Sequence, residues 1–255
     1  MVVGGMSQST RKRNYSGEQL EMTLANDVAR EWYGAADDLD LYELRWCRSR
    51  IRPGSTVVDC GAHHGLMAML FARWTGPAGR VIAYEPIPAN VETLKANLQL
   101  NSISNVLVRP VALGAAGGRQ KINVNGGNGV VGEGHLEIPV VRLDDDLDPG
   151  VAVHLLKVDV EGSDLDMLRG ASRAIAQRPL VALELHNFLF HDRGATLDAI
   201  FTLLDARHWR YEVLPMIGDS APAMVDGPMN IAWLSQFDNP HVFCSPRRAE
   251  TLLAG

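Results

Sequence analysis

The sequence contains few of the residues that mark disulfide-rich or zinc-binding proteins. Its three cysteines, Cys47, Cys60 and Cys244, are widely spaced, so they form neither a disulfide framework nor a CxxC metal motif. A reducing cytoplasm is the simplest setting for such a chain. No apolar run approaches about 18 residues, which argues against a transmembrane helix. The basic residues 11–13 are not followed by the apolar stretch that a signal peptide requires.

Several nucleotide-binding signatures are also missing. The net charge of −6 argues against the basic surface of a nucleic-acid-binding protein. No GK[ST] follows the glycine-containing turn at residues 61–65, which excludes a P-loop. The same turn is not the full G-x-G-x-x-G motif that receives a pyrophosphate.

The chain has the length of a single α/β domain, and it contains no evident repeat or linker. At 255 residues it can form one sizeable core with little left for a second. Leu20, Leu24 and Val28 fall on one helical face, and a second helix is expected over 41–51. We therefore expect four segments, which are a disordered leader (1–15), a helical cover (16–52), the main domain (53–235) and a C-terminal tail (236–255).

Hydrophobic runs alternate with helical patterns through the main domain, which predicts a parallel sheet with right-handed crossovers. The expected parallel strands are 56–59, 80–84, 106–108, 153–159 and 180–185. The expected helices are 65–74, the segment from Pro88 to Leu98, 163–175 with Ser163 as its cap, and 197–206. Strands 211–214 and 230–234 have no helix between them and are interpreted as an antiparallel pair.

Two further strands, 120–124 and 137–141, interrupt the parallel pattern after the third strand. The segment between them, 125–134, carries five glycines and is too glycine-rich to be rigid by itself. It is interpreted either as a long hairpin loop or as a flap over the site.

Carboxylates recur where the predicted parallel strands end. Asp59, Glu85, Asp159 with Glu161, and Glu184 with His186 all follow such strands. Ligands of open parallel sheets bind beyond the carboxyl ends of the strands, so these groups should share one site. Glu85 lies twenty residues after Gly65, where a carboxylate accepts hydrogen bonds from both hydroxyls of a ribose. An adenosyl ligand is expected, and NAD and S-adenosylmethionine compete for the assignment.

The second half of the chain favours S-adenosylmethionine. Residues 156–162 read Leu-Lys-Val-Asp-Val-Glu-Gly, and residues 168–171 read Leu-Arg-Gly-Ala. Together they resemble the hallmark of the FkbM family of S-adenosylmethionine-dependent methyltransferases. Further segments between Pro53 and His186 resemble other motifs of this family, namely 58–65, 83–86 with Asn90 and 94–97, 111–114, 141–144 and 183–186. The family usually has asparagine at the position of His63.

The resemblance implies a fold, an activity and a set of binding residues. The fold would be a class I methyltransferase, a Rossmann-like seven-stranded sheet of order 3-2-1-4-5-7-6 with strand 7 antiparallel, here with an extra β-hairpin after strand 3. The activity would be O-methylation of a small molecule, glycan or glycolipid. The implied cofactor-binding residues are Asp59, Gly61, Ala62, His63, Gly65, Glu85, Asn90, Val111, Ala112 and Asp159.

Methyl transfer to a hydroxyl benefits from a base that takes the proton as the oxygen attacks. The catalytic candidates are Asp159, Glu161, Glu184 and His186, and His186 is the first choice because histidine titrates near neutral pH. These acids, with His186, His191 and Asp192, could also hold a divalent ion that acidifies the hydroxyl. No metal is predicted.

Three alternatives define the tests of this interpretation. One is a catalytically silent S-adenosylmethionine-binding module, and another is an NAD-dependent oxidoreductase. A nucleic-acid or amide methylase is disfavoured because strand 4 ends in Asp-Val-Glu-Gly, not in the [DN]-P-P-[YF] that cradles a planar amine. The sequence does not identify the methyl acceptor or the oligomeric state.

Overall fold

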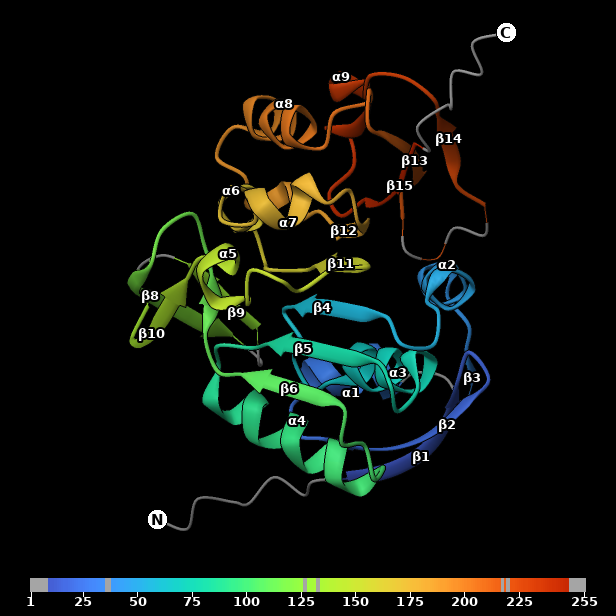
Figure 1. The fold of residues 1–255 in the computed structure, drawn as a ribbon. Coiled ribbons are helices and arrows are strands. Elements are labelled where there is room, and N and C mark those ends of the chain that lie inside the picture. The colour runs from blue at the N-terminus through green and yellow to red at the C-terminus, as the bar shows by residue number, and fades with distance from the viewer. Residues whose placement is uncertain are drawn as a thin grey trace, which may run out of the picture.

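A central mixed β-sheet organises the chain, and a second, smaller sheet lies beyond the carboxyl ends of its parallel strands (Figure 1). The computed structural model describes residues 9–34, 38–125, 128–131, 134–216, 218 and 221–247. The strands of the central sheet are β4 (Thr56–Cys60), β5 (Arg80–Tyr84), β6 (Val106–Arg109), β11 (Leu155–Val158), β12 (Leu180–Glu184), β13 (Trp209–Leu214), β14 (Ala223–Val225) and β15 (His241–Pro246).

The order of the central sheet is β6-β5-β4-β11-β12-β15-β13-β14. The first five strands in this order are parallel, and β15 runs antiparallel to both β12 and β13. Through β13 this is the order 3-2-1-4-5-7-6, and β14 adds an eighth strand to the expected seven. The register sets Asp59 opposite Lys157 and Glu184 opposite His241, so these four side chains start from neighbouring strands.

Helices and a hairpin cover the two faces of the sheet. One face packs against α5 (Leu143–Asp146), α6 (Asp164–Arg169), α7 (Ser172–Ala176) and α8 (Arg193–Leu203). The other face packs against α2 (Tyr42–Arg50), α3 (Leu66–Thr75), α4 (Pro88–Leu100) and an N-terminal hairpin. Burial on both faces explains why the parallel strands are continuous hydrophobic runs. Among the described residues, no helix is long and apolar enough to cross a membrane.

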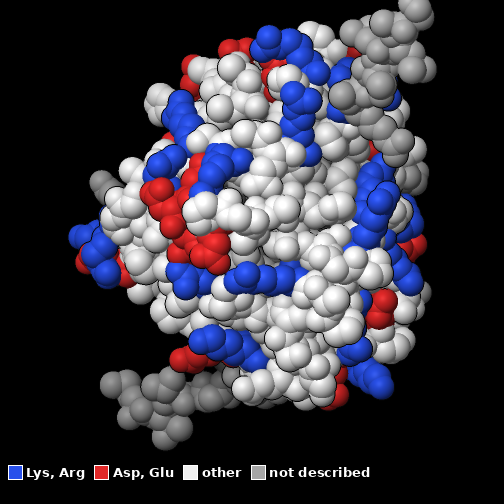
Figure 2. Space-filling view, in the orientation of Figure 1, with Lys and Arg blue, Asp and Glu red and all other residues white. Residues whose placement is uncertain are grey.

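The second sheet is the predicted hairpin after strand 3, enlarged to four strands. Its order is β7-β10-β8-β9, with bounds Ala112–Leu113 (β7), Gly118–Asn125 (β8), Asn128–Val131 (β9) and Leu136–Val141 (β10). Residues 126–127 and 132–133 of the glycine-rich segment lie outside the described residues. Ion pairs surround the nearby α5, including the pair of Arg109 with Asp146 and the pair of Arg142 with Asp145. Acidic and basic side chains accordingly lie together on the face shown in Figure 2.

The expected disordered leader is wrong at residues 9–15, and the expected helical cover is helical in two segments only among its described residues. Residues 9–15 form β1 (Ser9–Tyr15), which pairs with β2 (Glu18–Leu24) and with the short β3 (Asp38–Leu39). The helix over 16–28 was inferred from Leu20 and Leu24, but Met22 between them is also buried, which is the period of two of a strand. Helices do form as α1 (Asp27–Gly34) and as the expected α2. Residues 1–8 lie outside the described part.

Four expectations in the C-terminal half are also wrong. The expected final strand 230–234 is the short helix α9 (Ile231–Leu234), capped by the Asn230 side chain, which accepts from Trp233 N at 3.0 Å. The true antiparallel strand is β15, inside the expected tail. The single helix expected over 163–175 is divided into α6 and α7 at Gly170, where a Cβ would lie 2.1 Å from Gly114 O. Ser163 occupies the N-cap of α6, but its side chain makes no capping hydrogen bond.

Glu212 on β13 holds α2 against the sheet. Its carboxylate, in a residue only 9% exposed, accepts hydrogen bonds from Trp46 Nε1 and Arg50 Nη2, both at 2.8 Å, and from the Tyr42 hydroxyl. Glu212→Ala should lower the free energy of unfolding by about 3 kcal/mol because it leaves a buried indole N–H without an acceptor and breaks an ion pair. Urea denaturation followed by circular dichroism measures this loss.

Glu137→Ala is the matched control. Glu137 pairs with Arg119 through side chains that are 51% and 60% exposed. An exposed pair of this kind contributes less than about 1 kcal/mol. Equal destabilisation by the two substitutions would contradict the assigned role of Glu212.

Candidate active site

A cavity of about 750 Å³, open mouth included, lies at the carboxyl ends of β4, β5 and β11. This is the position at which open parallel sheets bind ligands. Several elements contribute to its wall, among them the turn after β4, the end of β5, the segment 111–113, the second sheet and helix α1. The lining residues used below are Trp32, Tyr33, Gly61, His63, Glu85, Asn90, Val111, Ala112, Gln120, Ile122, Ile138, Asp159 and Glu161.

The turn at 61–65 requires glycine at both ends. Gly61 has φ of +90°, and a Cβ there would lie 1.8 Å from the carbonyl oxygen of Asp159. Gly65 has φ of +88° and would place a Cβ 2.9 Å from the Leu94 side chain. His63 also has a positive φ, of +49°, although it is not glycine. The turn therefore lies tight against β11 and α4, and His63 is held in a costly conformation of the kind found at functional sites.

Glu85 fixes this turn from the end of β5. The residue is 4% exposed, and its carboxylate accepts hydrogen bonds from His63 N at 2.8 Å, Ile87 N at 2.9 Å and Asn90 Nδ2 at 3.2 Å. Burial raises the pKa of Glu85 to about 7, although these three donors oppose the shift. Glu85 lines the cavity, so its carboxylate both holds the turn and faces the ligand space.

The cavity collects most, but not all, of the expected cofactor residues. Its wall contains seven of them, Gly61, His63, Glu85, Asn90, Val111, Ala112 and Asp159. The other three, Asp59, Ala62 and Gly65, are not part of the wall. The carboxylate of Asp59 is fully buried opposite Lys157, and burial raises its pKa to about 7. The sequence predicts that Asp59 contacts the cofactor, but in the structure Asp59 lies outside the cavity wall.

Sequence reasoning missed two parts of the wall. Trp32 and Tyr33 on α1 line the cavity, and the Tyr33 hydroxyl lies 3.2 Å from His63 Nδ1. Gln120, Ile122 and Ile138 come from the second sheet. An aromatic pair in a short polar helix was the only signal for the first group. The alternation of polar and apolar residues in β8 marked Ile122 as inward-facing, but not what it faces.

His63 and His64 form a stacked pair between the turn and α1. Their ring centroids are 4.1 Å apart with an interplanar angle of 5°, and His64 Nε2 lies 3.2 Å from Asn26 Nδ2. Burial lowers the pKa of His63 to about 3 and that of His64 to about 4. Both imidazoles are therefore neutral at physiological pH in the folded protein. Two buried neutral rings are poor candidates for a metal pair and good packing for the cavity wall.

His63→Asn should make the protein less sensitive to acid. The folded-state pKa values of His63 and His64 lie below the unfolded value near 6.5, so stability is complete above pH 6.5 and falls as the pH drops towards 4. Each histidine contributes about 1.4 kcal/mol per pH unit to this loss. The variant should lose about that much less per unit between pH 6 and pH 4.5, as measured by urea denaturation. His135→Asn, at an exposed histidine, is the control and should keep the wild-type slope.

The four catalytic candidates are brought together at the ends of β11 and β12. His186 is 4% exposed, and its Nε2 lies 3.4 Å from Glu161 Oε2, 3.9 Å from Asp159 Oδ1 and 3.9 Å from Glu184 Oε1. Asp159 and Glu161 line the cavity, whereas Glu184 and His186 lie behind them. Glu161 has a positive φ of +50° and is followed by Gly162 at +85°. This strained turn holds the Glu161 carboxylate at the cavity.

Lys157 and the surrounding acids set the charges of this cluster. Lys157 Nζ donates to Asp159 Oδ2 at 2.9 Å. Burial opposes the charge on Lys157, but Asp159, Glu43, Asp59 and Glu184 outweigh it and keep the Lys157 pKa well above its usual value. Burial likewise opposes a proton on His186, yet the carboxylates of Asp159, Glu161, Glu184 and Asp164 raise its pKa. Burial raises the pKa of Glu161. The cluster thus attracts positive charge.

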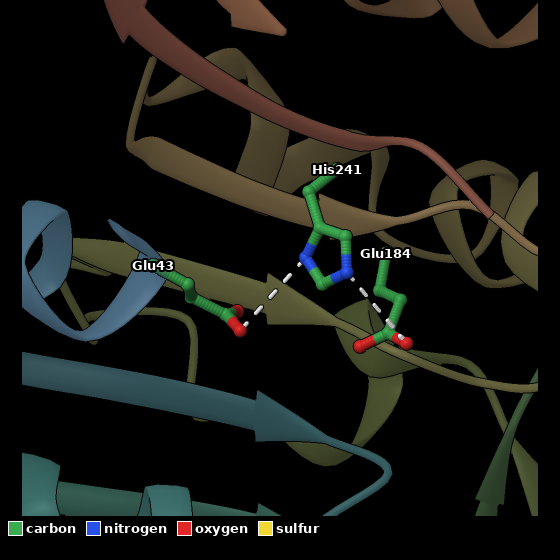
Figure 3. A group of neighbouring side chains, drawn as sticks. All are labelled: Glu43, Glu184 and His241. Carbon is green, nitrogen blue, oxygen red and sulfur yellow. Dashed lines mark ion pairs between the residues drawn. The ribbon is translucent and has the colours of Figure 1, made fainter. Parts of the chain in front are cut away.

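Glu184 also belongs to a second group, drawn in Figure 3. His241 lies between Glu184 and Glu43, with its Nε2 3.8 Å from Glu184 Oε1 and its Nδ1 3.9 Å from Glu43 Oε2. Asn239 Nδ2 donates to Glu184 Oε1 at 3.0 Å. Neither His191 nor Asp192 joins these groups, because both are exposed and Asp192 instead caps α8.

The strand order and the cavity at the strand ends define an α/β protein of the class I methyltransferase type. The model of the methyltransferase FkbM domain matches residues 59–213, and the chain belongs to that family. The match contains the turn, Glu85 and the whole cluster around His186, but not α1 or β15.

The individual proteins compared below are each less than 30% identical in sequence to this chain. The protein named methyltransferase 1 of Beauveria bassiana is 29% identical over 145 residues, which are 46% of this chain and 58% of that protein. The crystal structure of an FkbM methyltransferase from Methylobacillus flagellatus is 22% identical, with a TM-score of 0.47 over 78% of this chain and 50% of that one. Aeropyrum pernix fibrillarin, solved with bound S-adenosyl-L-methionine, is 14% identical, with a TM-score of 0.49 over 95% of this chain and 85% of that one. The chain therefore spans only 50–58% of the first two proteins.

Proposed function

We propose that this protein transfers the methyl group of S-adenosylmethionine to a hydroxyl group of a small molecule, glycan or glycolipid. The observation that carries the proposal is the convergence of Asp159, Glu161, Glu184 and His186 beside a cavity whose other wall is Glu85 and the 61–65 turn. The carboxylates and His186 suit proton removal from an acceptor. Glu85 and the turn suit binding of an adenosyl ligand. The FkbM family membership supports the methyl donor.

The residues of the cavity fit S-adenosylmethionine. The buried carboxylate of Glu85 and the close-packed Gly61 turn, where a Cβ would lie 1.8 Å from Asp159 O, belong to the same wall. Glu85 would hold the ribose, Val111 and Ala112 the adenine edge, and the Gly61 turn with Asp159 the amino-acid end. When bound, the cofactor supplies an activated methyl group, so that a bond from the acceptor oxygen to the methyl carbon forms as the carbon–sulfur bond breaks, the sulfur keeps the electron pair and the hydroxyl proton is released.

The protein's own contribution is to orient the acceptor and to take up its proton. Glu161 lines the cavity, while His186 lies behind it, 3.4 Å from its carboxylate. We propose that Glu161 receives the proton first and that His186 orders the carboxylates around it. The role of His186 as the base itself stays a prediction.

An assay with radiolabelled S-adenosylmethionine and a panel of hydroxylated acceptors tests the function. We expect label in sugars or other alcohols and none in matched acceptors whose hydroxyl is replaced by hydrogen. Calorimetry with S-adenosylhomocysteine and NAD accompanies the assay. Tight NAD binding without S-adenosylhomocysteine binding would contradict the proposal, and cofactor binding without transfer to any acceptor would favour a silent binding module.

A further inference from the structure

His186 directs one ring nitrogen at three carboxylates. Its Nε2 faces Asp159, Glu161 and Glu184 at 3.4–3.9 Å. The side chain is only 5% exposed, and its Nδ1 has no hydrogen-bond partner among the described residues. A buried polar ring therefore points into a group of anionic oxygens without a short hydrogen bond to any of them.

The distances of 3.9 Å from His186 Nε2 to Asp159 Oδ1 and Glu184 Oε1 are longer than hydrogen bonds and lie between the two ligand–ligand separations of an octahedral ion. A hydrogen bond to a carboxylate would bring the nitrogen and oxygen to about 2.7–3.2 Å. Ligands bound at about 2.1–2.3 Å to an octahedral ion lie about 3.0–3.3 Å apart when adjacent and about 4.2–4.6 Å apart when opposite. One ligand atom each from Asp159, Glu184 and His186 lie within 4.8 Å of one another, so small movements would bring all three onto one ion.

We propose that Asp159, Glu184 and His186 bind a divalent cation beside the cavity. Two carboxylates and one imidazole suit ions such as Mn²⁺, which accept both oxygen and nitrogen ligands. Three ligands from the protein leave coordination positions open for water or for the acceptor. The proposed role of the ion in catalysis rests on the proposed function, whereas the binding site itself does not.

The local charges support a cation at this position. Lys157 Nζ donates to Asp159 Oδ2, which leaves Oδ1 turned towards His186. The carboxylates of Asp159, Glu161 and Glu184 lie within 3.9 Å of His186 Nε2, and the Lys157 ammonium pairs with Asp159, which leaves an excess of negative charge when His186 is neutral. A divalent ion would offset this excess. Its desolvation would be compensated by direct bonds to anionic ligands.

The group in Figure 3 is a less suitable site, although it shares Glu184. Its three ligand atoms also lie within 4.8 Å of one another. His241, however, lies between its two carboxylates and presents a different ring nitrogen to each, Nδ1 to Glu43 and Nε2 to Glu184. A single ion can bind only one of these nitrogens. Neither Glu43 nor His241 lines the cavity, whereas Asp159 does.

The ion could also act on the acceptor. Asp159 lines the cavity, so a hydroxyl that reached the ion past this residue would be bound directly and its pKa lowered.

Mn²⁺ binding to the metal-stripped full-length protein tests the site without any need for activity. Electron paramagnetic resonance counts free Mn²⁺ during a titration at neutral pH. We expect one ion per chain with a dissociation constant below about 1 mM. His186→Asn should weaken binding at least about 30-fold, since even residues that only support metal ligands contribute 10–100-fold. The absence of Mn²⁺ binding to the wild-type protein would overturn the proposal, whatever the variants do.

His241→Asn and His135→Asn are the matched controls. His135→Asn should bind Mn²⁺ within about threefold of wild type, and His241→Asn, which contacts the ligand Glu184 without being a ligand itself, should weaken binding less than His186→Asn does. A larger loss in His241→Asn than in His186→Asn would move the ion to the group in Figure 3 and overturn the proposal. Thermal unfolding with and without Mn²⁺ guards against misfolding, since the ion should raise the melting temperature of the wild type but not that of His186→Asn.

Assays with chelator separate this proposal from the proposed function. Loss of methyl transfer in chelator, restored by Mn²⁺, supports both. Full transfer in chelator overturns the role of the ion but leaves O-methyl transfer intact. Mn²⁺ binding at His186 without transfer to any hydroxyl supports the site and contradicts the function.

Discussion

Glu85→Ala is expected to weaken S-adenosylmethionine binding by at least about 100-fold, or roughly 3 kcal/mol. The substitution removes the proposed ribose acceptor and also the acceptor for His63 N, Ile87 N and Asn90 Nδ2. A hydrogen bond to a charged group contributes about 1.5–3 kcal/mol, and the donors left behind are buried. The turn at 61–65 would lose its support at the same time. Isothermal titration calorimetry measures the affinity directly.

Two further variants sharpen this result. Glu85→Gln keeps one acceptor oxygen in the same place, so it should weaken binding by about tenfold rather than 100-fold. Because the pKa of Glu85 is about 7, its carboxylate gains charge as the pH rises from 6 to 8. Wild-type affinity should therefore increase over this range, and the affinity of Glu85→Gln should not. Glu92→Ala, at an exposed glutamate of α4, controls for loss of a nearby charge. If Glu85→Ala bound S-adenosylmethionine as tightly as the wild type does, the cofactor would not contact the part of the cavity wall formed by Glu85.

The sequence predicts the part of the site that lies at the ends of parallel strands. Strands buried on both faces are continuous apolar runs. The sequence alone therefore predicts β4, β5, β11 and β12 and the acidic residues that follow them. Parallel pairing then brings those ends to one edge of the sheet. Glu85, Asp159 and Glu161 were found in this way, and all three line the cavity.

The rest of the site depends on segments that carry weaker patterns. Two buried leucines four residues apart fit both a helix and a strand, which is why β2 was misread. The strand β15 has the run His-Val-Phe-Cys, but it follows a long irregular stretch and pairs with β12 and β13 only through tertiary contacts. Its first residue, His241, meets Glu184 solely because of that register. Periodicity within a segment contains no information about such a contact.

The burial of Asp59 shows a different limit. Its position after a strand and before a glycine turn is that of a ligand-binding acid. In the structure the preceding pleat turns the side chain into the interior beside Lys157, and the residue is fully buried. Alternate residues of a strand point to opposite faces, so the last residues of β4 cannot all face the cavity. The strand continues to Cys60, so the first residue after Asp59 that lines the cavity is Gly61. The sequence does not specify at which of these residues the strand ends.

His186→Ala is expected to lower the turnover number by about 10²–10⁴-fold and to leave S-adenosylmethionine affinity within about threefold of wild type. The imidazole lies at the centre of the carboxylates that would meet the acceptor, and loss of a positioned acid–base or metal-binding group has this magnitude. His186 does not line the cavity that fits the cofactor, so cofactor affinity should survive. Single-turnover rates with labelled S-adenosylmethionine separate the chemical step from product release.

His154→Ala is the matched control for this experiment. His154 precedes β11 at the amino end of the strand, whereas Asp159 follows its carboxyl end, so the control tests the same strand away from the cavity. It should keep wild-type turnover within about twofold. If His186→Ala retained wild-type turnover, the cluster would be structural. If it lost cofactor affinity and turnover in parallel, His186 would support the cavity wall rather than the acceptor, because a group that acts only in the transition state lowers turnover without changing cofactor binding.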